Sequence, residues 1–336
     1  MPRATAEAPH AAVAPGAVAQ ASWLDAAREQ LAATVRQQRV PHAVLIQDCP
    51  GAGGAQLGLW MATLLLCRAP EGERPCGSCA GCTGVAGNRH PDFTHVGFLE
   101  DSKQIRIEQA RELSAHLALA SHQGGYKVAL IDPADALNWN AANALLKTLE
   151  EPPSRTVLIL VAQQPSRLPA TILSRCQRVR IRAPERAPAL QWLNRFVGEG
   201  SWDAVLDVIG NAPLLAAELD PRAVLQVRDE TLAGLRDLAI RRADAAQLAD
   251  VWSRSELPLR LACFENWLTE RIRRGLGAGT YSVELRDGTH PERADPGSNV
   301  PRLFDLLDQL RSLRAALATP VNRSLVLESL LRSIVV

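Results

Sequence analysis

The sequence predicts an α/β domain built on a parallel sheet, followed by two regions made of helices. Short apolar runs recur between residues 43 and 182 with helical patterns between them. Buried strands separated by helices are typical of a parallel sheet covered on both faces. A glycine-rich turn follows the first apolar run, and after residue 183 the strand pattern gives way to amphipathic helical patterns.

The elements of the first domain follow one another in a regular order. Four runs have the apolar character of strands: 43–46, 126–132, 156–162 and 177–183. Three segments between them have helical spacing or length: 56–67, 141–151 and 167–176. The second of these helices is stopped by Pro152 and Pro153, because proline cannot continue a helix.

We expect three folded domains and one tail. The α/β domain spans 22–183 and includes a zinc module at 67–82, a small helical domain spans 184–228, and a larger helical domain spans 229–336. A polar loop rich in glycine, proline and charge interrupts the last domain at 279–301. Residues 1–21 are rich in alanine and proline and lack a continuous apolar stretch, so we expect a disordered tail rather than a signal peptide.

The composition narrows the classes of function. A net charge of +1 gives no global field that would attract nucleic acid or an anionic membrane. Aromatic residues make up 4% of the chain, which argues against a stacking platform for single strands. No apolar run reaches the roughly 18 residues of a membrane span. We therefore expect a cytoplasmic protein without a membrane partner, whose thiols stay reduced.

The turn after the first strand, QDCPGAGGAQLG, has the setting of a phosphate-binding loop but not its groups. In a loop of the form GxxxxGK[ST], backbone amides surround the phosphates, the lysine reaches them and the hydroxyl holds Mg²⁺. Here Asp48 stands at the first glycine, Gly54 at the lysine and Ala55 at the Ser/Thr position. The sequence therefore keeps the turn and lacks the side chains that would bind a nucleotide.

The acids that serve hydrolysis are also altered. P-loop enzymes end a second strand with two acids, one for Mg²⁺ and one for the attacking water. Asp132 keeps the first place, but the next residue is Pro133, which cannot accept a proton. Asp135, three residues on, is predicted to cap a helix.

The expected sensors of the γ-phosphate are missing as well. Gln163 and Gln164 follow the strand whose end would carry a Thr or Asn sensor. Leu214 and Leu215 stand where a helical lid would supply an arginine. Together with the altered loop, these positions predict that the chain does not hydrolyse nucleotide in its own pocket.

Four cysteines fall within a short loop-like stretch with C-x8-C-x2-C-x2-C spacing: Cys67, Cys76, Cys79 and Cys82. Four thiolates can close a tetrahedral Zn²⁺ site, and a closed site is structural because no position is left for water. The alternative is a set of reduced or disulfide-bonded cysteines in a loop. The paired C-x2-C spacing in a reduced compartment favours structural zinc.

Several motifs resemble the delta-prime family of bacterial DNA polymerase III clamp-loader subunits, a branch of the AAA+ proteins. They are PHAVLIQDCPGAGG, the cysteine run, HPDF, IRIEQARELSAHL, GGYKVALIDPADALNWNAANALLKTLEEPP and RLPATILSRCQ, in this order. The resemblance is specific from about residue 23 to residue 182. It is weaker towards the end, where NRSLVLESLL is similar to the collar domain of the family.

The resemblance implies a subunit of the DNA-directed DNA polymerase holoenzyme that does not hydrolyse ATP. Its partners would be delta and gamma or tau in a hetero-pentamer that uses ATP to place the ring-shaped beta clamp on primed DNA. The 184–228 region would be a lid and the 229–336 region an oligomerisation collar. Gly51, Gly53 and Gly54 would then be turn glycines that help the core and the subunit face to pack, with no ATP bound by this chain.

The resemblance also singles out Arg175, in the SRC triplet at 174–176. In the resembling family this arginine enters the ATP site of the neighbouring subunit, where a planar guanidinium can stabilise the charge of phosphoryl transfer. The alternative is a surface arginine at a helix end that interacts with the helix dipole. We favour the finger, because the triplet follows the expected sensor strand.

Other readings stay open for parts of the chain. An independent P-loop ATPase with a divergent nucleotide site is the main alternative function, and a zinc-dependent nucleic-acid binder is a more distant one. The basic run at 175–182 would contact DNA phosphates or alternate along an edge strand. Lys147, Glu150 and Glu151 are expected on a solvated helix face or at an interface rather than in catalysis.

Overall fold

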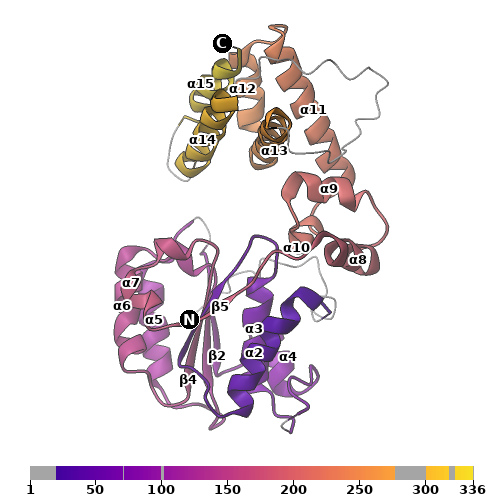
Figure 1. Cartoon of the computed structure of the whole chain (residues 1–336). Helices are drawn as coiled ribbons and strands as arrows, with labels where there is room; N and C mark the ends of the chain where they lie inside the picture. The colour runs from indigo at the N-terminus through magenta and orange to yellow at the C-terminus, as the bar shows by residue number, and fades with distance from the viewer. Residues whose placement is uncertain (1–19, 71, 100–101, 277–299, 318–321, 336) are drawn as a thin grey trace. The chain divides into compact units, whose positions relative to one another are not determined.

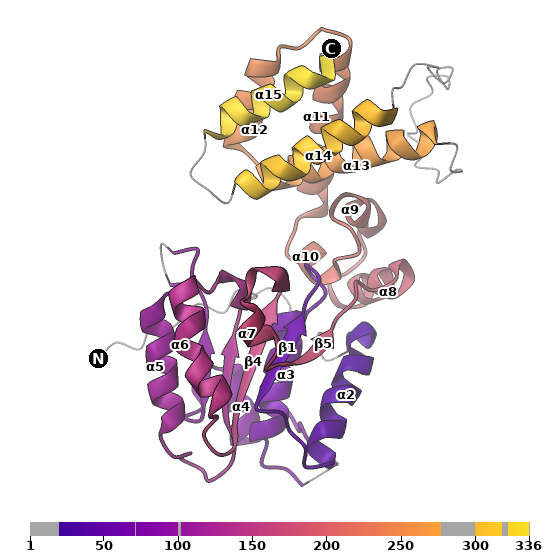
Figure 2. The same cartoon turned by 60° about the vertical axis from the view of Figure 1, so that its left-hand side comes forward.

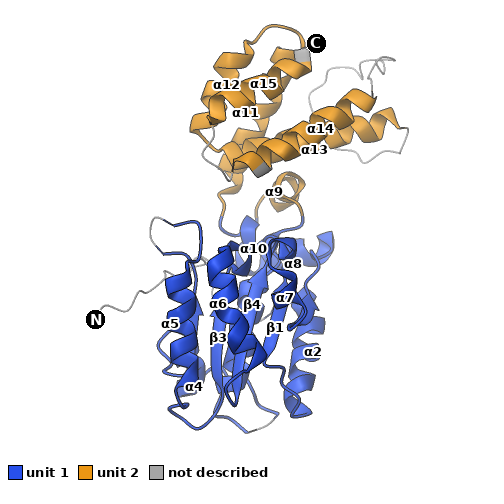
Figure 3. Ribbon diagram, turned by 90° about the vertical axis from the view of Figure 1, so that its left-hand side faces the viewer, with its two compact units in different colours: residues 1–199, 211–218 blue, residues 200–210, 219–336 orange. Residues whose placement is uncertain are grey.

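The computed structural model describes residues 20–70, 72–99, 102–276, 300–317 and 322–335. Among them, the residues up to Glu199 together with Asn211–Glu218 form unit 1, and Gly200–Gly210 together with the residues from Leu219 onwards form unit 2 (Figure 3). The tail expected at 1–21 and the polar loop expected at 279–301 lie almost wholly outside the described residues.

Within the described residues, unit 1 contains a five-stranded parallel sheet with the order β2-β3-β4-β1-β5. The strands are β1 (Ala43–Gln47), β2 (Phe93–Val96), β3 (Lys127–Ile131), β4 (Thr156–Ala162) and β5 (Gln177–Arg180). Both β3 and β4 are buried along their whole length, as in a sheet covered on both faces. The predicted α/β class is confirmed.

Helices cover the two faces of this sheet (Figures 1 and 2). One face carries α5 (Ile107–Ala118), α6 (Trp139–Glu150) and α7 (Ala170–Leu173), and the other carries α2 (Asp25–Arg36), α3 (Gly54–Leu66) and α4 (Ala80–Ala86).

The packing of the two faces fixes these helices on the sheet. On the first face, Leu145 and Leu149 of α6 are buried in one apolar cluster with Leu158 and Leu160 of β4. On the second face, α3 approaches the sheet so closely that a Cβ atom on Gly58 would lie 2.7 Å from Leu130 Cδ1. The elements that carry the candidate sites are therefore held by the core of unit 1.

The helices between 184 and 220 divide between the units. Unit 1 includes α8 (Arg186–Phe196) and α10 (Pro213–Ala216), whereas unit 2 includes α9 (Trp202–Ile209). The short 3₁₀ turns η1 (Ser22–Leu24), η2 (Ala134–Ala136) and η3 (Pro165–Arg167) all belong to unit 1.

Unit 2 is helical throughout its described residues. After α9 it contains α11 (Pro221–Ala239), α12 (Ala245–Arg254), α13 (Leu257–Gly275), α14 (Val300–Ala316) and α15 (Arg323–Val335). Trp252 and Phe264, both fully buried, meet edge to face in its core. No helix in the described part of the chain is both long and apolar enough to cross a membrane.

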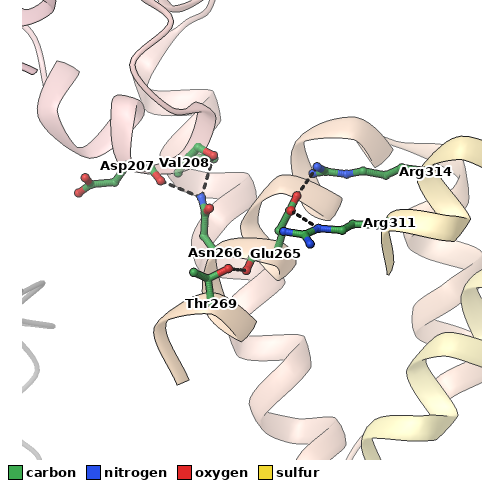
Figure 4. A network of polar contacts seen from close by, with 7 residues as sticks. All are labelled: Asp207, Val208, Glu265, Asn266, Thr269, Arg311 and Arg314. Carbon is green, nitrogen blue, oxygen red and sulfur yellow. Dashed lines mark hydrogen bonds and ion pairs between the residues drawn. The ribbon is translucent and has the colours of Figure 1, made fainter. Parts of the chain in front are cut away.

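Polar contacts attach α9 to the rest of unit 2 (Figure 4). Asn266 of α13 donates through Nδ2 to the backbone oxygens of Asp207 and Val208, at 2.7 and 2.8 Å. The neighbouring Glu265 pairs with Arg314 of α14. The two hydrogen bonds of Asn266 satisfy carbonyl groups in the last turn of α9, where a helix leaves its carbonyls without a partner.

Candidate functional site

The glycine-rich loop after β1 is closed from within by the side chain of Asp48. Its Oδ1 atom accepts a hydrogen bond from the backbone N–H of Gly54 at 3.0 Å. Gly54 is the first residue of α3. In a working loop, the free N–H groups at such a helix N-terminus bind phosphate. Here one of them is bonded to a carboxylate of the same chain.

The absence of a side chain at Gly54 makes this contact possible. A Cβ atom on Gly54 would lie 2.5 Å from Cγ of Asp48, a separation at which one group has to move. Gly53, with a φ of 106°, is the left-handed residue that precedes the helix. Gly54 was expected in the turn, but it is helical, and its role is to leave room for Asp48.

Residues 212–215 cover the loop from outside. The backbone N–H of Leu214 donates to the carbonyl of Gly51 at 3.1 Å. A Cβ atom on Gly51 would lie 2.9 Å from Cβ of Leu215, and one on Gly53 would lie 3.0 Å from Cδ1 of Leu214. Leucines therefore pack on the loop at the positions where an arginine sensor was expected.

The N-terminal segment covers a further part of the loop. Trp23 donates through Nε1 to the carbonyl of Ala52 at 2.8 Å. A Cβ atom on Gly53 would also lie 3.2 Å from Cδ1 of Leu24. Ala52 is fully buried as a result. The loop is thus covered by two other segments of unit 1, the N-terminal segment and residues 212–215.

The loop after β3 differs from the expectation at Asp135. The predicted helix cap is wrong: η2 has Pro133 at its N-cap, and no side chain accepts a capping hydrogen bond there. Asp135 instead accepts a hydrogen bond from the backbone N–H of Gln164 at 2.8 Å. This contact joins the loops that follow β3 and β4. The side chain that caps α6 is Asn138, which accepts from the N–H of Ala141.

The four predicted cysteines form one cluster. Their sulfur atoms all lie within 4.8 Å of one another. Four sulfurs bound at about 2.3 Å in a tetrahedron stand about 3.8 Å apart. Cys67 Sγ lies 3.6 Å from that of Cys76 and 3.8 Å from that of Cys79, and Cys82 Sγ lies 3.8 and 3.5 Å from the same two atoms. The cluster has the dimensions of a site for one tetrahedral metal ion.

Backbone N–H groups around the cluster lower the pKa of two of its four cysteines. Backbone N–H groups of Ser78 and Cys79 lower the pKa of Cys76 to about 6, and those of Arg68 and Cys82 lower the pKa of Cys79. Burial raises the pKa of Cys82 to about 12. A bound metal would have to displace the proton of Cys82, whereas Cys76 and Cys79 lose their protons more readily than ordinary thiols.

The cysteine cluster is attached to the sheet through a short polar chain. Arg68, next to Cys67, donates through Nε to Oε1 of Gln123 at 3.2 Å. The backbone N–H of Gln123 donates to Oδ2 of Asp92 at 3.1 Å. Asp92 precedes β2 and is 1% exposed. The cluster therefore lies on the surface of unit 1 but has a defined link to its core.

The chain on both sides of Arg175 is packed against the core of unit 1. Leu173 and Cys176 both pack against the apolar cluster of unit 1. Burial raises the pKa of the Cys176 thiol to about 11, so this thiol stays neutral near pH 7. The side chain of Arg175 is 34% exposed.

Two groups of the same chain hold the guanidinium of Arg175. Its Nη2 atom donates to Oε1 of Glu150 at 2.7 Å, and its Nη1 atom donates to the carbonyl of Thr171 at 2.8 Å. Glu150 is the last residue of α6, and Thr171 lies in α7. The sequence predicted Glu150 on a solvated helix face or at an interface, because nothing local indicates a partner 25 residues away.

Arg175 and the glycine loop lie at opposite ends of the sheet. Arg175 comes just before β5, whose first residue, Gln177, is paired with Val44 of the parallel strand β1. The loop begins four residues after Val44, at Asp48, which corresponds to roughly 13 Å along the strand. Arg175 therefore lies at the end of the sheet opposite to the loop of its own chain.

Comparisons with known proteins agree with this architecture. A family model described as "DNA polymerase III, delta subunit" matches residues 23–185. The DNA polymerase III subunit delta' of Pseudomonas aeruginosa is 34% identical over 296 residues, which cover 86% of this chain and 90% of that protein. The chain belongs to the DNA polymerase III subunit delta' family. The delta' subunit of Escherichia coli K12 is 32% identical over 313 residues, with 92% and 93% of the two chains covered.

Among solved structures, a DNA polymerase III gamma subunit-related protein of Thermotoga maritima aligns over 93% of this chain and 98% of its own, with 18% identity and a TM-score of 0.47. The delta' relatives confirm the resemblance that the motifs indicated. This delta' family member is a clamp-loader subunit of DNA polymerase III, and the alternative of an independent ATPase is not favoured.

Proposed function

We propose that this chain takes part in ATP-dependent clamp loading without hydrolysing ATP itself. The observation that carries the proposal is the hydrogen bond from Gly54 to Asp48, which occupies an N–H group that a working loop would offer to phosphate. The cover formed by Leu214 and Trp23 supports it further. Without a lysine at position 54 or an acid at position 133, a nucleotide that reached the loop would lack the groups for hydrolysis.

We further propose that Arg175 acts in trans on the ATP site of a neighbouring subunit. Its guanidinium is always protonated and offers N–H groups in a planar fork, which suits bidentate hydrogen bonds to a γ-phosphate. Its place at the amino end of the strands supports a role on a neighbour rather than on its own loop. In the ATP site of the neighbour, the guanidinium of Arg175 would stabilise the negative charge that develops during phosphoryl transfer.

The partners and the metal complete the proposal. We propose delta and gamma or tau as the partners, a collar formed by 229–336, a lid formed by 184–228, and the beta clamp on primed DNA as the target of the assembled complex in the cytoplasm. We propose zinc as the ion of the four-cysteine cluster, because the sulfur spacing fits its tetrahedral bonds. The exposed Arg178 and Arg180 of β5 alternate with a buried valine, which supports the edge-strand reading of the basic run.

The experiment is the ATPase activity of the reconstituted complex in the presence of clamp and primed DNA. Arg175→Ala should leave folding and assembly unchanged and should slow the neighbouring site on the order of 10³-fold or more, so that total turnover falls by the share of that site. Arg175→Lys should be nearly as impaired, because lysine keeps the charge but not the planar fork. Arg178→Ala, on the same edge, is the matched control and should behave as wild type. A wild-type rate with Arg175→Ala would contradict the proposal.

A further inference from the structure

We infer that Glu150 is a positioning residue for Arg175: it holds the guanidinium at the amino end of the sheet in an orientation ready to meet a phosphate. This inference rests on the proposed role of Arg175 in trans. It assigns a function to the acid at the end of α6, which was expected on a solvated helix face or at an interface.

The two residues that form the pair are both fixed by the core. Leu145 and Leu149 anchor α6 up to its last residue, Glu150. Leu173 and Cys176 anchor the backbone on both sides of Arg175. Because both backbones are packed against the core, a contact of 2.7 Å between the side chains defines where the guanidinium lies.

The pair leaves Arg175 able to bind a ligand. A guanidinium has five N–H groups. The short contacts to Glu150 and Thr171 use one N–H on each of two nitrogens, and a longer contact of 3.4 Å joins Nη1 to the hydroxyl of Ser174. N–H groups therefore remain for a phosphate while Glu150 stays bound. Arg175 does not have to leave its partner in order to act.

Two effects of Glu150 on a phosphate oppose each other. An unrestrained arginine loses rotamer freedom when a ligand fixes it, and a contact that fixes it beforehand reduces this cost. The negative charge of the carboxylate, however, repels a phosphate that approaches the same guanidinium. We infer that orientation outweighs repulsion, because Glu150 is 50% exposed and solvent screens its charge.

The test compares Glu150→Ala with Glu150→Gln in the reconstituted complex, with clamp and primed DNA. The alanine variant loses the contact, and turnover at the neighbouring ATP site should fall about two- to fivefold, the size of an exposed ion pair's contribution, so that the total rate falls less than in Arg175→Ala. The glutamine variant keeps an acceptor oxygen at the same place and should retain at least the wild-type rate. Glu151→Ala, which removes the neighbouring exposed acid, is the control for net charge and should match wild type.

The outcomes separate this inference from the proposed function. If Arg175→Ala lowers the rate but Glu150→Ala matches or exceeds wild type, the positioning role is overturned and the role of Arg175 stands. A Glu150→Gln complex as slow as Glu150→Ala also overturns positioning. If Arg175→Ala itself has the wild-type rate, the proposed function fails first. In the Glu150→Ala/Arg175→Ala double variant, we expect the rate of Arg175→Ala alone, because Glu150 acts through Arg175.

Discussion

The carboxylate of Asp48 and the backbone N–H of Gly54 are joined by a hydrogen bond of 3.0 Å that spans the glycine loop. A residue at the beginning of the loop thus supplies an anionic oxygen to the helix at its end. In a nucleotide-binding loop that oxygen would belong to a phosphate. The loop of this chain can therefore hold its shape without a ligand.

The first prediction concerns the contribution of Asp48 to stability. In Asp48→Ala the buried N–H of Gly54 loses its acceptor, and we expect the free energy of unfolding to fall by about 1–3 kcal/mol. Asp48→Asn keeps an acceptor oxygen but not the charge, so its loss should be smaller. Urea unfolding of the isolated chain measures both. Equal stability of Asp48→Ala and wild type would show that the hydrogen bond does not support the loop.

The second prediction concerns the lysine position. Gly54→Lys places a Cβ atom 2.5 Å from Cγ of Asp48, so the Asp48 side chain has to move. We expect a loss of about 1–3 kcal/mol in the free energy of unfolding, as for an overpacked core. The Asp48→Gly/Gly54→Lys variant removes the clash and should recover part of the loss. Thermal or urea unfolding measures the stability of both variants. A higher free energy of unfolding in the double variant than in Gly54→Lys would separate this clash from a general effect of lysine.

The Gly54→Lys substitution should also fail to create an ATPase. Pro133 still stands where a working enzyme has an acid, and Leu214 still covers the loop. A phosphate-release assay on the isolated single and double variants should give the background rate. A rate that saturates with ATP in either variant would show that the lysine was the one group missing.

The third prediction concerns the cysteine cluster. Metal analysis should find one zinc per chain in protein prepared without chelators, and Cys79→Ala should lose it while Cys49→Ala, a cysteine outside the cluster, keeps it. A structural zinc is worth about 10 kcal/mol where it organises a whole small domain. Here β3 and β4 form a core without it, so chelation should raise hydrogen exchange mainly in 67–86. Cys79→Ala protein that retains a full equivalent of zinc would contradict this assignment.

The fourth prediction concerns pH. Burial lowers the pKa of His95 in β2 below its usual value of 6.5, and its Nε2 atom has no hydrogen-bond partner in the part of the chain that the structure describes. Below about pH 6.5 the unfolded chain binds a proton that the folded chain does not, so stability falls as the pH falls. His95→Leu should reduce this dependence between pH 8 and pH 5.5. Unfolding of wild type and His95→Leu in excess zinc measures the pH dependence of stability. Identical pH profiles of the two proteins would contradict the prediction.

The sequence predicted the features whose signals are local. The apolar runs VALI, which forms most of β3, and TVLILVA, which forms β4, predict buried strands, and the C-x2-C spacing keeps cysteines close together along the chain. By contrast, β2 has the short sequence FTHV, in which two of four positions are half-buried. It lacks the continuous apolar run that would have predicted a strand.

The missed contacts depend on residues that the fold brings together. Asp135 bonds to Gln164 because the loops after β3 and β4 are neighbours, whereas the sequence offered a cap for the nearest helix. Glu150 meets Arg175 because α6 and α7 lie on the same face of the sheet. The contact of Asp48 had one indication in the sequence: an acid stands at the first glycine position and a glycine at the lysine position. The hydrogen bond between these two residues explains the combination.

We propose that this chain has no working nucleotide site and influences ATP turnover through a neighbour. The measurement that tests it most directly is binding and hydrolysis of Mg²⁺-ATP by the isolated chain, by calorimetry and phosphate release on the same preparation. We expect no saturable heat of binding at millimolar ATP and no hydrolysis above background, because Asp48 occupies an N–H group of the loop and Leu214 covers it. A saturable, Mg²⁺-dependent ATPase rate in the isolated chain would contradict it.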